Sequence, residues 1–269
     1  AASDVYKRQL PKYVKKTEEI IPFVKQWIQG QESRFQRKVL KLFEGAGVDK
    51  RYSIMDLEEV FLNSSFEEKN NIYINEVTKL AEQSLLKSLK KAGLQPTDID
   101  YIITVSCTGI MIPSVDAYLV NSLNMKQDIV RLPVTEMGCV AGISGIIYAK
   151  NFLKSNPNKR AAVIAVEAAT ATFQIEDYSM TNIVSAAIFG DGSASVILSS
   201  CKEDKGPEII DEAMYHFYDS IDIMGFKLVN TGLQMILDKN VPETISNHFS
   251  EIIEPFLDFL IKGIALFVK

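Results

Sequence analysis

Helical and strand-like apolar patterns alternate along the middle of this sequence, and that alternation limits the fold more than any other feature. The run Ile99–Val105 is rich in β-branched residues and is typical of a strand buried on both faces of a sheet. The patterns predict helices over 72–92, 114–123 and 140–155 and strands over 99–105, 129–133 and 161–166. Helices that alternate with buried strands favour a layered α/β fold with a largely parallel central sheet.

Other segments extend this pattern in both directions. Gly93 is expected to cap the helix that ends at residue 92. The turn Gly190–Gly192 is expected to join two neighbouring strands. The remaining predicted elements are helices over 18–43 and 241–261 and strands over 186–189, 193–198 and 208–218.

The two ends of the sequence differ from its middle. Residues 1–10 contain the string SDVYKRQ, which resembles translated sequencing-adapter read-through, so we expect a non-native leader outside the fold. The charged stretch 202–206 separates a first unit, 11–205, from a second unit, 206–269. No helix-stop signal follows the last apolar run, so the second unit is expected to be only the beginning of a truncated C-terminal half.

Charge and cysteine content exclude several classes of protein. The sequence has 29 basic and 34 acidic residues, a net charge of -5, so we expect no general attraction to nucleic acid or to an anionic membrane. No apolar stretch approaches the roughly 20 residues that cross a bilayer, which favours a soluble cytoplasmic protein. The three cysteines form no CxxC pair, which argues against a disulfide framework and a structural zinc site.

Cys139 is the clearest candidate for a reactive residue in this sequence. A predicted strand leads into Thr135–Gly138 and a predicted helix follows, so the thiol is expected at a helix amino terminus. Unpaired N–H groups and the helix dipole stabilise a thiolate there, and the thiolate attacks thioesters. Gly142 and Gly145 would let an acyl group or another segment approach closely. The same position also suits a small buried apolar cysteine, and spacing alone does not separate the two interpretations.

Four ordered segments favour the nucleophile: SCTGIMIPSVDAYL, TEMGCVAGISG, VEAATATF and AAIFGDGSASVIL. Together they resemble the type III polyketide synthases, the chalcone-synthase-like enzymes, over about Lys38 to Val241. The resemblance implies a thiolase-like layered fold, with a complete N-terminal half and only the start of the C-terminal half. It also implies an acyltransferase that acts as a homodimer on acyl-CoA and malonyl-CoA, without metal or organic cofactor.

The resemblance also implies roles for individual residues. The catalytic pair falls on Cys139, the acyl-accepting nucleophile, and Phe189, which guards the junction between the active-site cavity and the CoA tunnel. Without the resemblance, Phe189 equally suits a core aromatic at a strand end. Positions that contact substrate fall on Cys107, Ala169, Thr172 and Met235. Because Met235 stands where plant enzymes carry a second aromatic gatekeeper, it suggests, together with Ala169, a cavity shaped for an aliphatic acyl chain. A methionine at this position equally suits an ordinary core residue.

Three further residues are implied at the edges of the site. Lys38 and Lys41 fall on positions that contact CoA phosphates, although lysines at this spacing also suit a solvated helix face. Ile112, before Pro113, falls on the residue that reaches into the partner subunit's cavity.

The histidine and asparagine that complete the family's site lie beyond the last residue of this sequence. His216 and His248 fall outside the family's histidine motif and are expected to be structural. The resulting prediction is decarboxylative Claisen condensation through a Cys139 thioester by the complete enzyme, with the fragment inactive in condensation. Two alternatives are an initiating ketoacyl-ACP synthase of fatty-acid synthesis and a non-catalytic thiolase-like module that binds acyl-CoA.

Overall fold

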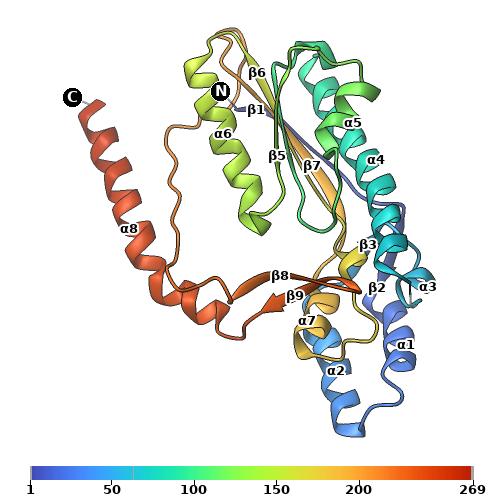
Figure 1. The fold of residues 1–269 in the computed structure, drawn as a ribbon. Helices are drawn as coiled ribbons and strands as arrows, with labels where there is room; N and C mark the ends of the chain where they lie inside the picture. The colour runs from blue at the N-terminus through green and yellow to red at the C-terminus, as the bar shows by residue number, and fades with distance from the viewer. Residues whose placement is uncertain (1, 63, 268–269) are drawn as a thin grey trace.

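The computed structural model describes residues 2–62 and 64–267 and contains one five-stranded sheet and two small two-stranded sheets (Figure 1). The strands are β1 (Ala2–Gln9), β2 (Tyr13–Lys16), β3 (Lys50–Ser53), β4 (Tyr101–Val105), β5 (Val130–Val134), β6 (Arg160–Glu167), β7 (Gly192–Ser199), β8 (Met224–Val229) and β9 (Gly232–Leu237). The α-helices are α1 (Thr17–Trp27), α2 (Ser33–Gly45), α3 (Leu57–Val60), α4 (Phe66–Ala92), α5 (Val115–Ser122), α6 (Ala141–Ser155), α7 (Met180–Ile188) and α8 (Val241–Phe267). Single 3₁₀ turns are η1 (Pro96–Asp98), η2 (Gly138–Val140) and η3 (Ala169–Thr172).

The large sheet has the strand order β1-β7-β6-β4-β5. Its central strand β4 pairs in parallel with β5 and with β6, as the α/β pattern predicts. The β6–β7 and β1–β7 pairs are antiparallel, so the sheet is mixed rather than largely parallel. The reason is the position of α7, which lies beyond the end of β6 instead of over a face, so the chain re-enters the sheet and runs back (Figure 1).

Helices cover both faces of this sheet, with α4 and α5 on one side and α6 on the other (Figure 1). Alternation along β4 sends Ile102 into the cluster under α4 and α5, and Ile103 and Val105 into the cluster under α6. Every residue of β4 is buried, which confirms the prediction of a strand covered on both faces. The helix α4 begins at a capping box on Ser65 and ends at Gly93 in the left-handed conformation, as expected.

A smaller apolar cluster lies where α1, α2 and α7 meet, below the sheet in Figure 1. Its fully buried members include Val24 of α1, Val39 of α2 and Ile183 of α7. The two-stranded sheet β2–β3 connects this cluster to the large sheet. The hairpin β8–β9 follows, and α8 extends away from the large sheet (Figure 1).

Three further expectations about the fold are wrong. Residues 2–9 form β1, and Arg8 and Gln9 pair with Ala194 and Ser193 of β7, so residues 2–9 do not lie outside the fold. Residues 186–188 end the helix α7 instead of forming a strand, because a short apolar run suits either element and this one continues from residue 180. The turn over 190–192 therefore joins a helix to a strand. The segment 208–218 contains no strand.

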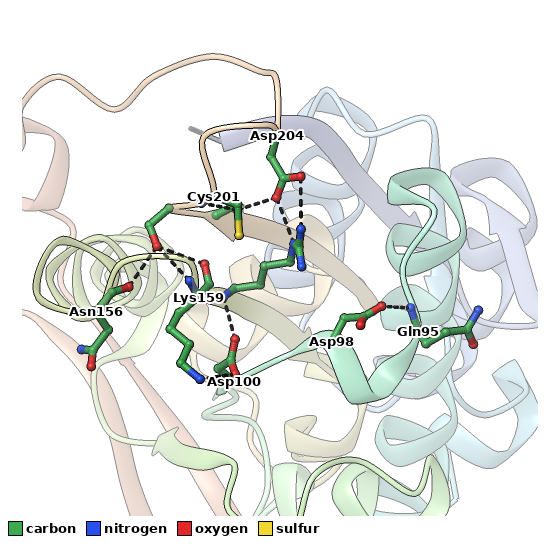
Figure 2. A network of polar contacts seen from close by, with 10 residues as sticks. Gln95, Asp98, Asp100, Asn156, Lys159, Cys201 and Asp204 are labelled. Carbon is green, nitrogen blue, oxygen red and sulfur yellow. Dashed lines mark hydrogen bonds and ion pairs between the residues drawn. The ribbon is translucent and has the colours of Figure 1, made fainter.

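Charged side chains link the amino-terminal ends of the parallel strands β4, β5 and β6. Asp100, which precedes β4, accepts hydrogen bonds from Lys126 Nζ at 2.7 Å and from the N–H of Arg160 at 3.0 Å. It also accepts one from Lys159 Nζ at 2.9 Å (Figure 2). Arg160 in turn pairs with Asp204 at 2.9 Å. This network ties the starts of β4, β5 and β6 together. Within the described residues no helix is long and apolar enough to span a membrane.

Candidate active site

Three neighbouring parallel strands present polar residues at one edge of the sheet. Cys107 follows β4, Cys139 follows β5, and Glu167 is the last residue of β6. Because β4 lies between β5 and β6 and all three run in the same direction, their carboxyl ends meet at this edge. This is the edge at which α/β proteins commonly bind ligands.

The chain around Cys139 forms a tight turn between strand and helix. Gly138 has a φ of +59°, a conformation that costs glycine little, and Cys139 follows it in η2, directly before α6. The thiol is exposed, which excludes the buried interpretation of this cysteine. A Cβ added to Gly142 would meet no atom within 4 Å, whereas one added to Gly145 would lie 3.0 Å from Val163. Open space therefore adjoins Gly142, and close packing against the sheet begins one turn later, at Gly145.

Glu167 holds the loop that carries Cys107. The N–H of Cys107 donates to both carboxylate oxygens of Glu167, at 3.0 and 3.1 Å, and Thr108 Oγ1 donates at 2.6 Å. Burial and then the Glu167 charge raise the pKa of Cys107 to about 12, and a charge on Cys139 adds to this rise. Burial also raises the pKa of Glu167, against the hydrogen bonds that it accepts. Cys107 is therefore a neutral thiol near the exposed Cys139.

Asp191 is the second buried carboxylate and joins this edge to the adjacent cavity. It accepts hydrogen bonds from the N–H of Ile54 (2.7 Å), the N–H of Thr170 (2.9 Å) and Thr170 Oγ1. Burial raises its pKa to about 6, and the negative charge of Glu167 contributes to the rise. Through Thr170, Asp191 fixes the η3 turn, which carries Ala169 and Thr172.

An apolar cavity lies between β2, β3, α2, η3 and α7. Four of the predicted site residues, Ala169, Thr172, Phe189 and Met235, line it together. Most of the remaining wall is aliphatic or aromatic: Tyr13, Val14, Ile20, Phe43, Tyr52, Met55, Leu57, Val60, Phe61, Phe173 and Ala186. Cys107 and Cys139 lie outside this wall, at the sheet edge. The structure therefore places two of the predicted residues at a thiol edge and four in an apolar cavity, whose wall residue Thr170 is hydrogen-bonded to Asp191.

One buried cation stands in the cavity wall. Arg51 of β3 is 8% exposed, and burial lowers the pKa of its guanidinium. Its Nε donates to the carbonyl of Ala187 at 2.9 Å and its Nη1 donates to Thr17 Oγ1 at 2.8 Å. No acidic residue lines the cavity within the described part of the chain.

The remaining predicted residues lie on the surface. Lys38 and Lys41 are exposed on α2, and Arg34 and Arg37 lie on the same face at helical spacing. The same helix supplies Phe43 to the cavity, so this basic face and the cavity share one element. Ile112 is 93% exposed.

Sequence patterns alone do not identify three residues that matter here, namely Glu167, Asp191 and Arg51. Only Glu167 has a signal in the sequence, because it is a charged residue at the end of the apolar run that forms β6. The histidines lie elsewhere: His248 hydrogen-bonds to Glu251 on α8 at 3.0 Å, and His216 packs against Tyr218. Among the described residues no group of three or more His, Cys, Asp or Glu side chains could hold a metal ion.

Comparison with known proteins assigns the family. Residues 8–201 match the model of the N-terminal domain of chalcone and stilbene synthases. The 1,3,6,8-tetrahydroxynaphthalene synthase of Streptomyces peucetius subsp. caesius is 30% identical over 221 residues, which are 81% of this chain and 58% of that protein. The putative chalcone synthase of Bacillus subtilis strain 168 is 29% identical over 93% of this chain and 71% of its own length.

Solved structures agree with this assignment. The crystal structure of 1,3,6,8-tetrahydroxynaphthalene synthase from Streptomyces coelicolor A3(2), a bacterial type III polyketide synthase, matches with a TM-score of 0.89 and 27% identity. The match covers 94% of this chain and 72% of that one, so the mixed α/β fold is the thiolase-like fold of these enzymes. The chain spans 58% and 59% of two of its curated relatives, the Streptomyces peucetius enzyme and the phloroglucinol synthase of Pseudomonas fluorescens Pf-5. The chain belongs to the chalcone and stilbene synthase family.

Proposed function

We propose that this chain is the nucleophile-bearing part of a type III polyketide synthase, an acyltransferase that loads an acyl group from acyl-CoA onto Cys139. The observation that carries the proposal is the exposed thiol of Cys139 at the start of α6, at the carboxyl edge of three parallel strands. The dipole of α6 stabilises negative charge there, and only the thiolate attacks a thioester carbonyl.

The proposed reaction has two covalent stages. In the first, the Cys139 thiolate attacks the acyl-CoA carbonyl, the thioester bond to CoA breaks, and CoA leaves as the thiolate. In the second, malonyl-CoA loses carbon dioxide, and the resulting enolate attacks the acyl carbonyl, forming a carbon–carbon bond and releasing Cys139. The second stage needs donors that stabilise the enolate. Because His216 and His248 make their contacts elsewhere, we expect this chain to perform the first stage and not the second.

The cavity favours an aliphatic acyl group. Its wall is largely apolar, and Met235 contributes a flexible side chain where a rigid ring would limit the space. Ala169, with a single methyl group, keeps the η3 side of the cavity open. A linear chain can bury its methylene groups against these residues at about 0.8 kcal/mol for each group.

Two surfaces complete the proposal. The exposed cations Lys38 and Lys41 on α2 would bind the phosphates of CoA, and Phe43 of the same helix would guide the acyl chain into the cavity. Exposed Ile112, with neighbouring Ile110, Val140 and Ile143, would form part of a homodimer interface.

Measuring the release of CoA distinguishes acyl transfer to the protein from simple binding of acyl-CoA. We expect an initial burst of one equivalent of CoA per chain, measured by chromatography, when the protein is mixed with octanoyl-CoA, and no burst with Cys139→Ala. A non-catalytic acyl-CoA-binding module would bind the thioester in both proteins and release no CoA. Octanoyl transfer from an acyl carrier protein with none from CoA would instead support the ketoacyl-ACP synthase alternative, which the family match disfavours.

A further inference from the structure

Phe189 directly follows α7 and lines the cavity, and the residues on either side of it are hydrogen-bonded to the strand β3. Phe189 is the residue directly after α7, with an extended ψ of 154°, and its N–H still donates to the carbonyl of Ser185 at 2.9 Å. Phe189 and Tyr52 of β3 both line the cavity. No helix or strand includes Phe189 itself, so its position depends on how the flanking residues are held.

On the amino-terminal side, Arg51 holds the last turn of α7. Both Nε, at 2.9 Å, and Nη2 donate to the carbonyl of Ala187, two residues before Phe189. The last turn of α7 contains no basic residue of its own, and a helix carboxyl terminus attracts a cation. Arg51 is anchored in turn by Thr17 Oγ1 at 2.8 Å and by the ring of Phe43, whose centroid lies 5.7 Å away.

On the carboxyl-terminal side, the backbone of β3 and the residue after it hold Asp191. The N–H of Asp191 donates to the carbonyl of Tyr52 at 2.9 Å, and its carboxylate accepts the N–H of Ile54 at 2.7 Å. Between these contacts, a Cβ on Gly190 would lie 3.3 Å from the carbonyl oxygen of Tyr52. The turn therefore rests directly on β3, and Phe189 is fixed two residues before and two residues after its own position.

We propose that Arg51 is a positioning residue that sets the place of the Phe189 ring at the cavity. The two fixed points lie on the same strand, so a change at Arg51 frees the amino-terminal side of the turn while Asp191 holds the other. The consequence for the reaction rests on the proposed function: a ring that moves no longer shields an acyl group on Cys139 from water, and the acyl-enzyme hydrolyses faster.

The position of the ring can be measured without any reaction. The sequence has 14 phenylalanines, so 4-trifluoromethylphenylalanine is introduced at position 189 alone and observed by ¹⁹F NMR. In the parent protein we expect one narrow resonance. In Arg51→Gln, which removes the charge and part of the donor fork, we expect a shifted, split or broadened resonance.

A matched arginine controls for general loss of stability. Arg160→Gln breaks the pair with Asp204 at the opposite edge of the sheet and should leave the ¹⁹F signal unchanged. If Arg51→Gln does not fold, Arg51→Lys, which keeps the charge but not the planar fork, is judged by the same criterion. A folded Arg51 variant with the parent's resonance overturns the proposal.

The lifetime of the octanoyl group on Cys139, followed by intact-protein mass spectrometry, tests the consequence. We expect a several-fold shorter lifetime in Arg51→Gln and an unchanged lifetime in Arg160→Gln. An altered ¹⁹F resonance with an unchanged lifetime would overturn the shielding role. If the parent forms no acyl-enzyme, the proposed function fails, while the ¹⁹F comparison still decides whether Arg51 positions Phe189.

Discussion

The N–H of Cys107 and the carboxylate of Glu167 form a two-pronged contact, at 3.0 and 3.1 Å, that joins the residues after β4 to the end of β6. Burial and then the Glu167 charge raise the pKa of Cys107 to about 12. Glu167→Gln should therefore lower the pKa of Cys107. The measurement is the pH dependence of alkylation in a Cys139→Ser, Cys201→Ser background, with exposed Glu203→Gln as the control. An unchanged profile would contradict the electrostatic coupling.

The raised pKa of Asp191 should make its contribution to the free energy of unfolding fall as the pH rises. Burial raises its pKa from 3.8 to about 6, so the folded state binds its proton more tightly than the unfolded state does. Its stabilising contribution, on the order of 3 kcal/mol, is fully present below about pH 4 and is lost as the pH rises to about 6. Urea unfolding of the parent and of Asp191→Asn from pH 4 to pH 7 should show their difference narrowing or reversing in that window. A constant difference would refute this assignment.

Asp100 should show the opposite dependence. Burial acts to raise its pKa, but hydrogen bonds from Lys126, Arg160 and Lys159 outweigh this effect and lower the pKa. Its folded pKa therefore lies below the unfolded value, and its contribution is present above about pH 4 and is lost as the pH falls through the folded pKa. Asp100→Asn should be less stable than the parent at pH 7 and approach it in acid. A penalty that persists at low pH would show that packing, not charge, dominates.

Two glycines near the site should respond oppositely to alanine. A Cβ on Gly109 would overlap the ring of Tyr73, which is buried and hydrogen-bonded to Ser106 at 2.6 Å. Gly109→Ala should cost about 1–3 kcal/mol of unfolding free energy, because the ring has no space to move. Gly142→Ala meets no atom within 4 Å in α6 and should gain up to about 1 kcal/mol. Equal effects in denaturant titrations would contradict the tight packing of Gly109 against Tyr73.

Ala169 should limit the length of the acyl group. Ala169→Leu fills the cavity at the η3 turn, so transfer from long acyl-CoAs should fall about tenfold or more while transfer from butyryl-CoA continues. Rates of CoA release across a series from butyryl-CoA to dodecanoyl-CoA give the measurement, and butyryl-CoA serves as the internal control. A uniform loss for all lengths would show that the cavity does not hold the acyl chain.

The local elements can be predicted from the sequence because their signals are local. The β-branched run of β4 and the glycine after α4 lie within the segments that they define. The strand β1 cannot be predicted in this way, because its partner β7 lies more than 180 residues away and only the pairing makes residues 2–9 a strand. Residues 186–188 are ambiguous because a run of three apolar residues suits both a helix and a strand.

The candidate site divides in the same way. Cys139 can be found from the glycines and helix around it and from the ordered motifs that resemble the family. Glu167 and Arg51 act through partners 60 and 136 positions away in the sequence, and a single charged residue shows no such partner in advance. Asp191 lies inside a recognised motif, but its burial and its three donors are properties of the folded chain.

Intact-protein mass spectrometry followed by peptide mapping tests the central claim most directly. After incubation with octanoyl-CoA, we expect a single octanoyl group, removable by hydroxylamine and located on Cys139. Cys139→Ser should remain unlabelled, and Cys201→Ser should be labelled like the parent. An octanoyl group on Cys107 or Cys201, or no covalent group on the folded chain, would contradict the claim that Cys139 is the nucleophile.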